Sequence, residues 1–128
     1  MKDYLKDYPK RGEIWLVSLE PVAGHEIDKT RPALVISNDR NNEFSSTVTV
    51  IPITSSSMEK VYPFEVLILK TESGLASDSK IKCNQIRTLD KSRLLKLSGV
   101  LSLDKMVEVE SALMIHLDIS GNISERIF

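Results

Sequence analysis

The chain has 128 residues, of which 41% are hydrophobic, 27% charged and 5% aromatic, and its formal net charge is −1. This length and composition predict one soluble globular domain, and no apolar run approaches the ~20 residues that span a bilayer. One cysteine, Cys83, and two histidines exclude an intrachain disulfide and a Cys/His zinc cage. Residues 1–8 contain no apolar signal-peptide core, so we expect a cytoplasmic protein.

Most of the predicted elements are short strands separated by Pro, Gly, Ser and Asn. In chain order we predict strands over 13–19, 32–37, 47–54, 64–69, 79–89 and 97–101. The strand at 79–89 is expected to be one long or bent strand. Pro52 is expected to mark an edge or a bulge, because proline donates no backbone hydrogen bond. Residues 38–42 predict a turn with one helical turn after it, and 90–94 predict another helical turn.

One helix is predicted near the C-terminus, with Ser102 as its N-cap and residues 103 to about 118 as its body. Its apolar stripe follows spacings of three and four through Leu103, Met106, Val109, Leu113 and Leu117. His116 borders this stripe and is expected to be a partly buried packing residue. Short strands followed by one helix predict a small twisted barrel, because barrel closure removes exposed strand edges.

Arg31 stands between a polar segment and an apolar strand and is followed by Pro32. Proline disfavours the helical region for the residue before it, so Arg31 should be extended at the mouth of the strand. A guanidinium held there could bind a phosphate through two hydrogen bonds. From its position alone, an arginine at the start of a strand is more often a solvated edge residue with no function.

Few catalytic templates fit the remaining residues. The chain has no phosphate-binding P-loop and no Gly-x-Ser-x-Gly elbow, and Cys83 lies in an alternating strand where a packed, inert thiol is expected. His25 is the one histidine placed to act as a general acid or base. Polar groups at strand ends remain: Arg31, Thr54, Asn84, Gln85 and Arg87.

Such groups suffice for RNA cleavage, because RNA supplies its own 2′-hydroxyl nucleophile and the protein need only align it and stabilise the developing charge. A run of six basic residues and one acid between Lys80 and Lys96 adds weak support for a polyanion partner.

Four sequence blocks occur in order along the chain: Arg11–Trp15, Gly24–Ile36, Val50–Ser55 and Cys83–Asp90. Together they resemble the MazF/PemK family of endoribonuclease toxins over residues 11 to about 117. The resemblance implies an SH3-like barrel domain with a C-terminal helix over 11–118, an N-terminal extension at 1–10 and a tail at 119–128. It implies a homodimer that needs no cofactor or metal and cleaves single-stranded RNA at selected sequences, leaving 2′,3′-cyclic phosphate and 5′-hydroxyl ends. It also implies a MazE-like antitoxin whose disordered tail occupies the RNA groove.

The family's catalytic pair maps onto Arg31 and Thr54. Arg31 would hold the phosphate and protonate the leaving 5′-oxygen, because an arginine is too basic to act readily as a general base. Thr54 would donate a hydrogen bond to the phosphorane. His25 and Glu26 are both open as the group that deprotonates the 2′-hydroxyl. The RNA-binding or site-supporting set is His25, Glu26, Ser55, Gln85, Arg87, Lys80 and Lys82.

Two other functions are compatible with such a barrel. The gyrase-poisoning CcdB toxins share the fold, but their function resides in a C-terminal Trp-Gly-Ile. This chain ends Glu125-Arg126-Ile127-Phe128, and its one tryptophan is Trp15. A plain SH3-like binding module would normally expose aromatic side chains for peptide capture, and aromatics are scarce here.

Overall fold

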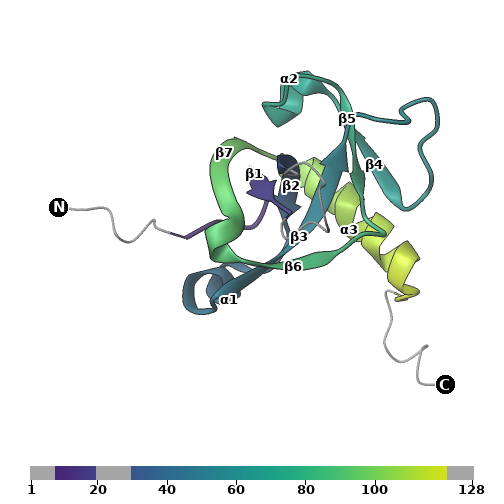
Figure 1. Cartoon of the computed structure of the whole chain (residues 1–128). Coiled ribbons are helices and arrows are strands. Elements are labelled where there is room, and N and C mark those ends of the chain that lie inside the picture. Colours follow the sequence, from purple (N-terminus) through teal and green to yellow (C-terminus); the bar gives the residue numbers. More distant parts are fainter. Residues whose placement is uncertain (1–7, 20–29, 121–128) are drawn as a thin grey trace, which may run out of the picture.

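The computed structural model describes residues 8–19 and 30–120, which form one antiparallel sheet with a helix packed across it (Figure 1). Within these ranges the strands are β1 (Glu13–Ser18), β2 (Thr30–Val35), β3 (Thr47–Thr54), β4 (Glu65–Ile68), β5 (Ser79–Lys82), β6 (Arg87–Asp90) and β7 (Leu94–Val100). The helices are α1 (Asp39–Phe44), α2 (Lys70–Ser73) and α3 (Leu103–Leu117), with a 3-10 turn at Lys91–Arg93. The predicted mainly β fold with a C-terminal helix is confirmed.

The sheet does not close into a hydrogen-bonded ring. The strand order is β4-β5-β3-β2-β1-β7, with β6 paired to β3, and no pairing in the described ranges joins β4 to β7. The closure that we expected is therefore absent. Lys105 of α3 reaches one end of this path, where its Nζ donates to the carbonyl oxygen of Leu67 in β4 at 3.0 Å.

The segment predicted as one strand over 79–89 is in fact two strands that both pair with β3. Ile81 of β5 pairs with Ile53, whereas Arg87 of β6 pairs with Val50. A turn closed by the hydrogen bond from the Gln85 amide to the Lys82 carbonyl separates them. The turn was not predictable from the apolar pattern, because alternation continues on both sides of it.

Pro52 is not at an edge, and that prediction is wrong: β3 lies inside the sheet and Pro52 is buried. The carbonyl of Thr49 accepts hydrogen bonds from the amides of Ile36 and Ser37, on the β2 side of β3. Because backbone groups point to alternate sides along a strand, the N–H and C=O groups of residues 50 and 52 face the neighbour on the other side of β3. On that side β6 pairing ends at Val50 and β5 pairing begins at Ile53. Pro52 therefore lies in the gap between the part of β3 that pairs with β6 and the part that pairs with β5. Its lack of an N–H group costs no hydrogen bond between strands there.

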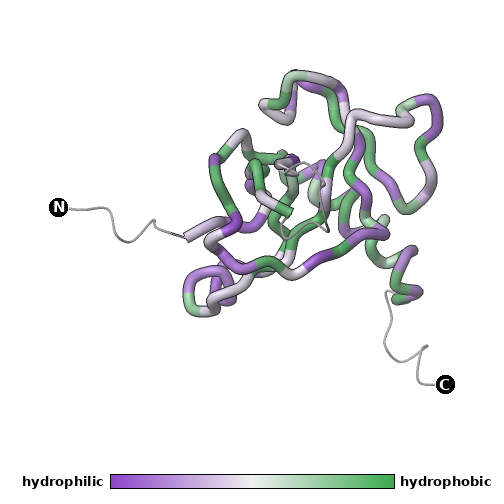
Figure 2. The backbone as a smooth tube through the Cα atoms, viewed as in Figure 1, coloured by the Kyte–Doolittle hydropathy of each residue, from purple (hydrophilic) through white to green (hydrophobic). Residues whose placement is uncertain are grey.

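The core consists of two buried clusters, one on each face of the sheet, as strand alternation requires. The first lies under α3 and includes Ile14, Leu34, Ile51, Ile81 and Val109. The second comprises Val17, Ala33, Val35, Val48, Val50 and Leu89. Figure 2 shows hydrophobic residues along the central strands and hydrophilic residues around α1. The second cluster matters most for function, because the candidate site lies where it ends.

Helix α3 begins as predicted, with the Ser102 side chain accepting from the Lys105 amide. Its buried side is formed by Met106, Val109 and Ala112, so the predicted stripe is only partly correct. Leu103 is 83% exposed and Leu117 is 48% exposed. His116 is also exposed, which contradicts its expected packing role. The small Ala112 side chain is buried against the sheet, whereas the larger Leu103 and Leu117 at the two ends of the helix are exposed.

The turn after α2 contacts β7 backbone to backbone. Gly74 has a φ of +76°, and a Cβ on it would lie 2.3 Å from the Ser98 carbonyl oxygen. A Cβ on Gly99 would likewise lie 2.3 Å from the Ser73 carbonyl oxygen. Only glycine fits at either position. This contact fixes the turn that leads from α2 into residues 75–77, and these residues line part of the candidate site.

Candidate active site

The register between β2 and β3 brings Arg31 level with Thr54. Ala33 pairs with Pro52, and two more residues in that antiparallel register place Arg31 opposite Thr54. By alternation, both side chains lie on the sheet face of the second core cluster, just beyond its last buried residues. Both line two adjoining cavities of about 340 Å³ and about 230 Å³. The two predicted catalytic residues therefore occupy one place.

The Arg31 side chain is exposed at the opening of β2. Among the described residues, no carboxylate or carbonyl group is bonded to its guanidinium. Its N–H donors are therefore available for an anion that enters the cavity. The rigid strand behind Arg31 holds its backbone, because Val17 of β1 pairs with it directly.

Thr54 closes β3 and is half-buried. Its Oγ1 accepts a hydrogen bond of 3.0 Å from the Ser56 amide, which restricts the rotation of the hydroxyl. In the described part of the chain, no acceptor takes the hydroxyl proton. The hydroxyl can therefore donate to a ligand while its oxygen stays bonded to the turn.

The larger cavity is strongly cationic. Arg31, Lys80, Lys82 and Arg87 line it, and its described lining contains no acidic side chain. Gln85 also lines it from the turn between β5 and β6. Clustered positive charge in a concave, partly buried place favours a polyanion much more than the net charge of −1 suggests.

Lys80 is 2% exposed and its ammonium is fully engaged. Nζ donates to the carbonyls of Ser57 at 2.7 Å and Lys60 at 2.9 Å, and lies 3.1 Å from Glu65 Oε1. Lys82 is more accessible, and its Nζ lies 2.7 Å from Glu65 Oε2. These contacts indicate that the role of Lys80 is to support the structure of the site. The basic run from Lys80 to Lys96 is therefore not one surface patch.

The Glu65 carboxylate lies between these two lysines and is 5% exposed. Burial alone would raise its pKa, but hydrogen bonds from Lys82, the Tyr62 amide and Lys80 outweigh burial and leave the pKa below its ordinary value. Glu65 is therefore ionised at neutral pH. The same charge acts on Cys83: burial first, and then the repulsion by Glu65, raise the pKa of this thiol to about 12. Cys83 is buried, as predicted, and stays a neutral thiol.

Not every predicted site residue can be placed. His25 and Glu26 lie outside the described residues, as does most of the loop before Arg31. Ser55 is exposed and lines the smaller cavity. Asn84, named as a strand-end polar group, has a buried Oδ1 that makes no hydrogen bond to the described residues. Sequence reasoning missed Glu65, whose contact with two lysines depends on the pairing of β4 with β5.

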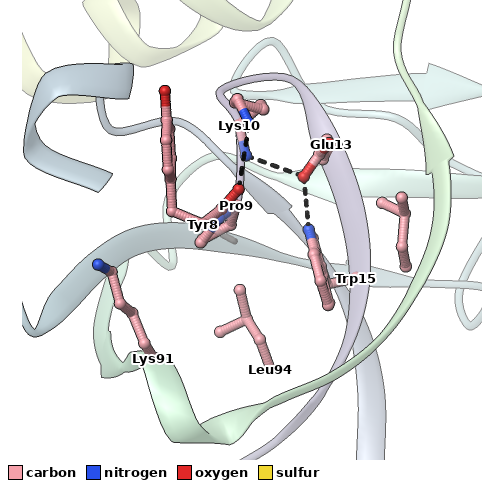
Figure 3. Close-up of a pocket in the computed structure, with 8 residues that line it drawn as sticks. Tyr8, Pro9, Lys10, Glu13, Trp15, Lys91 and Leu94 are labelled. Carbon is pink, nitrogen blue, oxygen red and sulfur yellow. Dashed lines mark hydrogen bonds between the residues drawn. The ribbon is translucent and has the colours of Figure 1, made fainter. Parts of the chain in front are cut away.

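A larger pocket of about 570 Å³ lies elsewhere and holds none of the predicted site residues (Figure 3). In it, Glu13 Oε1 accepts from Trp15 Nε1 at 2.9 Å and from the Lys10 amide at 2.8 Å. Trp15 of β1 and Leu19, just after the end of that strand, pack against the second core cluster, and Leu19 lines the cationic cavity. The two pockets thus lie near opposite ends of that cluster. The candidate site differs from this larger pocket in its positive charge and in the predicted residues that meet in it, not in its volume.

The fold and the site define a small β-sheet protein whose cationic cavity presents a guanidinium and a hydroxyl to an anionic ligand. The chain belongs to the family of PemK-like, MazF-like toxins of type II toxin–antitoxin systems, which matches residues 10–117. In the described part of the chain, no helix is long and apolar enough to cross a membrane.

The relatives are similar along nearly the whole chain. Endoribonuclease MazF9 of Mycobacterium tuberculosis (strain ATCC 25618 / H37Rv) is 43% identical over 115 residues, which cover 86% of this chain and 97% of that protein. Endoribonuclease MazF of Staphylococcus epidermidis is 42% identical over 112 residues, covering 88% of this chain and 93% of that protein. Among solved structures, a MazE–MazF crystal structure from Deinococcus radiodurans is 31% identical with a TM-score of 0.73, covering 88% of this chain and 97% of the matched chain.

Proposed function

We propose that this toxin is an endoribonuclease that cleaves single-stranded RNA at selected sequences, without a metal or cofactor. The observation that carries the proposal is the β2–β3 register, which brings Arg31 and Thr54 into one cationic cavity. The names of two relatives that are 42% and 43% identical, both endoribonucleases, support the reaction class.

In the proposed reaction, the 2′-oxygen of RNA attacks the adjacent phosphorus and the bond to the 5′-oxygen breaks, giving a 2′,3′-cyclic phosphate and a 5′-hydroxyl. Arg31 holds the non-bridging oxygens with two N–H donors and supplies the proton to the leaving 5′-oxygen. Thr54 donates its hydroxyl hydrogen to the phosphorane, where negative charge increases in the transition state. The 2′-hydroxyl proton goes to a base that the described residues do not include, with His25 and Glu26 both open.

Cleavage of a long single-stranded RNA in EDTA tests the proposal, with the fragment ends mapped. Arg31→Ala should lower kcat by roughly 100-fold or more, because it removes the main charge opposite the phosphorane. Arg40→Ala removes an exposed arginine from α1 and should leave the rate unchanged. Wild-type cleavage rates in Arg31→Ala would contradict the assignment of this residue.

Thr54 can be tested with two variants that separate the contribution of its hydroxyl from that of its methyl group. Thr54→Val removes the hydroxyl and should lower kcat by about 10-fold or more, whereas Thr54→Ser keeps it and should remain within a few-fold of wild type. A loss in Thr54→Ser as large as that in Thr54→Val would contradict the role assigned to the hydroxyl. No cutting of varied RNAs by the folded protein would shift the proposal to a protein target such as gyrase, which a pull-down would then test.

The partners in this proposal are single-stranded RNA, a MazE-like antitoxin and a second copy of the chain. The cationic cavity suits an acidic antitoxin tail that competes with RNA. Exposed apolar side chains on α3 and β7, including Leu103, Val107, Leu95 and Val100, offer a surface for a homodimer. Light scattering on the purified chain should give twice its mass of 14.4 kDa. Because mRNA is the proposed substrate, the proposed location is the cytoplasm.

A further inference from the structure

The Lys80 ammonium connects the strand β5 to the chain segment between β3 and β4. It is buried, and its three N–H donors match three oxygens: the carbonyls of Ser57 and Lys60 and the carboxylate of Glu65. A lysine has three donors and no acceptor, so none of its donors remains for a phosphate. Lys80 lines the cationic cavity, yet the contacts of its ammonium group are all with atoms of the protein.

The contacted segment, residues 55–64, is held at several points. Glu65 Oε1 also accepts from the Tyr62 amide at 3.1 Å. Ser57 has a φ of +53°, a left-handed conformation that costs a non-glycine residue energy and persists only when its surroundings enforce it. The carbonyl of this same residue accepts the 2.7 Å hydrogen bond from Lys80. The buried cation therefore stabilises the strained residue directly.

This segment is also a wall of the candidate site. Ser56 and Ser57 line the cavity with Arg31, and the Ser56 amide is the group that restrains the Thr54 hydroxyl. A shift of Ser57 would therefore move both the wall and the hydroxyl. Displacements of about 1 Å in a catalytic group can cost about 100-fold in rate.

We infer that Lys80 is a positioning residue that sets the RNA sequence preference and the turnover of the site by holding residues 55–64 in one conformation. This inference rests on the proposed ribonuclease function. It assigns Lys80 no contact with RNA, in contrast to Lys82, which is partly exposed in the same cavity and contacts neither loop carbonyl.

The test compares Lys80→Met with Lys82→Met, because each removes one positive charge from the same cavity and one partner from Glu65. In Lys80→Met the ratio of preferred to non-preferred cleavage on a long RNA should fall about 10-fold, and kcat at the preferred site should fall by about 10-fold or more. In Lys82→Met, KM and its salt dependence should change while the cleavage pattern stays that of wild type.

Hydrogen exchange supplies a readout that needs no RNA. The amides of residues 56–62 should exchange at least about 10-fold faster in Lys80→Met than in wild type, with no such change in Lys82→Met. If wild type cuts no RNA, the proposed function fails, and hydrogen exchange still decides whether Lys80 holds the loop.

A second pair of variants perturbs the loop from its exposed surface, where folding is not at risk. Ser57→Gly tolerates the positive φ, so the amides of residues 58–62 should exchange within a few-fold of the wild-type rate, whereas Ser57→Val does not tolerate it and should accelerate that exchange as Lys80→Met does. The inference is overturned if folded Lys80→Met keeps the wild-type pattern and kcat, if both lysine variants change KM alone, or if Ser57→Gly and Ser57→Val behave alike.

Discussion

Glu65 contacts the ammonium groups of both Lys80 and Lys82, and its replacement by glutamine tests what these two ion pairs contribute to stability. The substitution preserves shape but leaves the 2% exposed Lys80 ammonium and the Lys82 ammonium without a negative partner. Removing one member of a buried ion pair costs about 3–5 kcal/mol, because the remaining charge is buried and uncompensated. Glutamine retains one acceptor oxygen, so we expect the lower end, about 3 kcal/mol.

Urea unfolding followed by circular dichroism measures this loss. At about 4 °C per kcal/mol for a domain of this size, the same change should lower Tm by about 12 °C. Glu59→Gln is the matched control: it removes the same charge from an exposed position in the loop that precedes β4, and should cost no more than about 0.5 kcal/mol.

The pH dependence of this loss of stability follows from the pKa of Glu65. The pKa of Glu65 is lower folded than unfolded, so its stabilisation is complete above the unfolded value of about 4.3 and disappears as the pH falls through the folded value. The gap between wild type and Glu65→Gln should therefore narrow in acid. A gap that stays constant below pH 4 (roughly the unfolded pKa), or a loss no larger than that of Glu59→Gln, would refute this reasoning.

Three other predictions concern single contacts. Gly99→Ala should destabilise the fold by about 2 kcal/mol or more in urea unfolding, because its Cβ would lie 2.3 Å from the Ser73 carbonyl oxygen; a neutral result would mean that α2 moves freely. Cys83 should resist a thiol reagent at pH 8 (about half a unit below the pKa of a free thiol) in the native protein and react fully in urea, because burial raises its pKa to about 12; fast native labelling would contradict this. Asn42→Ala should cost about 1–3 kcal/mol in the same unfolding assay, because the buried amide bonds to both the side chain and the carbonyl of Ser37; an unchanged midpoint would show that water replaces it.

The sequence predicted the strand that carries Arg31 and the strand that ends at Thr54, because proline and a change from apolar to polar residues mark those positions locally. The register between these two strands brings Arg31 and Thr54 together, and the local sequence pattern carries no information about that register. Glu65 was missed for the same reason, since its lysines belong to a neighbouring strand. The roles of Arg31 and Thr54 in RNA cleavage stay predictions.

Other errors have specific physical causes. The pattern of α3 allowed several rotations of the helix, and the one adopted buries Ala112 and leaves Leu103 and His116 outside. Pro52 looked like an edge residue because a missing donor is normally harmless only at an edge. A strand whose neighbour changes halfway provides a second place for it, and nothing local in the sequence reveals that change.

The open path of the sheet has a consequence for how the protein behaves at high concentration. An unpaired terminal strand is a template on which another chain can add, and this is a common start of aggregation. At β4 that risk is limited in two ways: the strand has only four residues, and Lys105 occupies the carbonyl of Leu67 while carrying a charge to the same border. The lysine that joins helix to sheet thus also acts as a gatekeeper against the growth of the sheet from one molecule into the next.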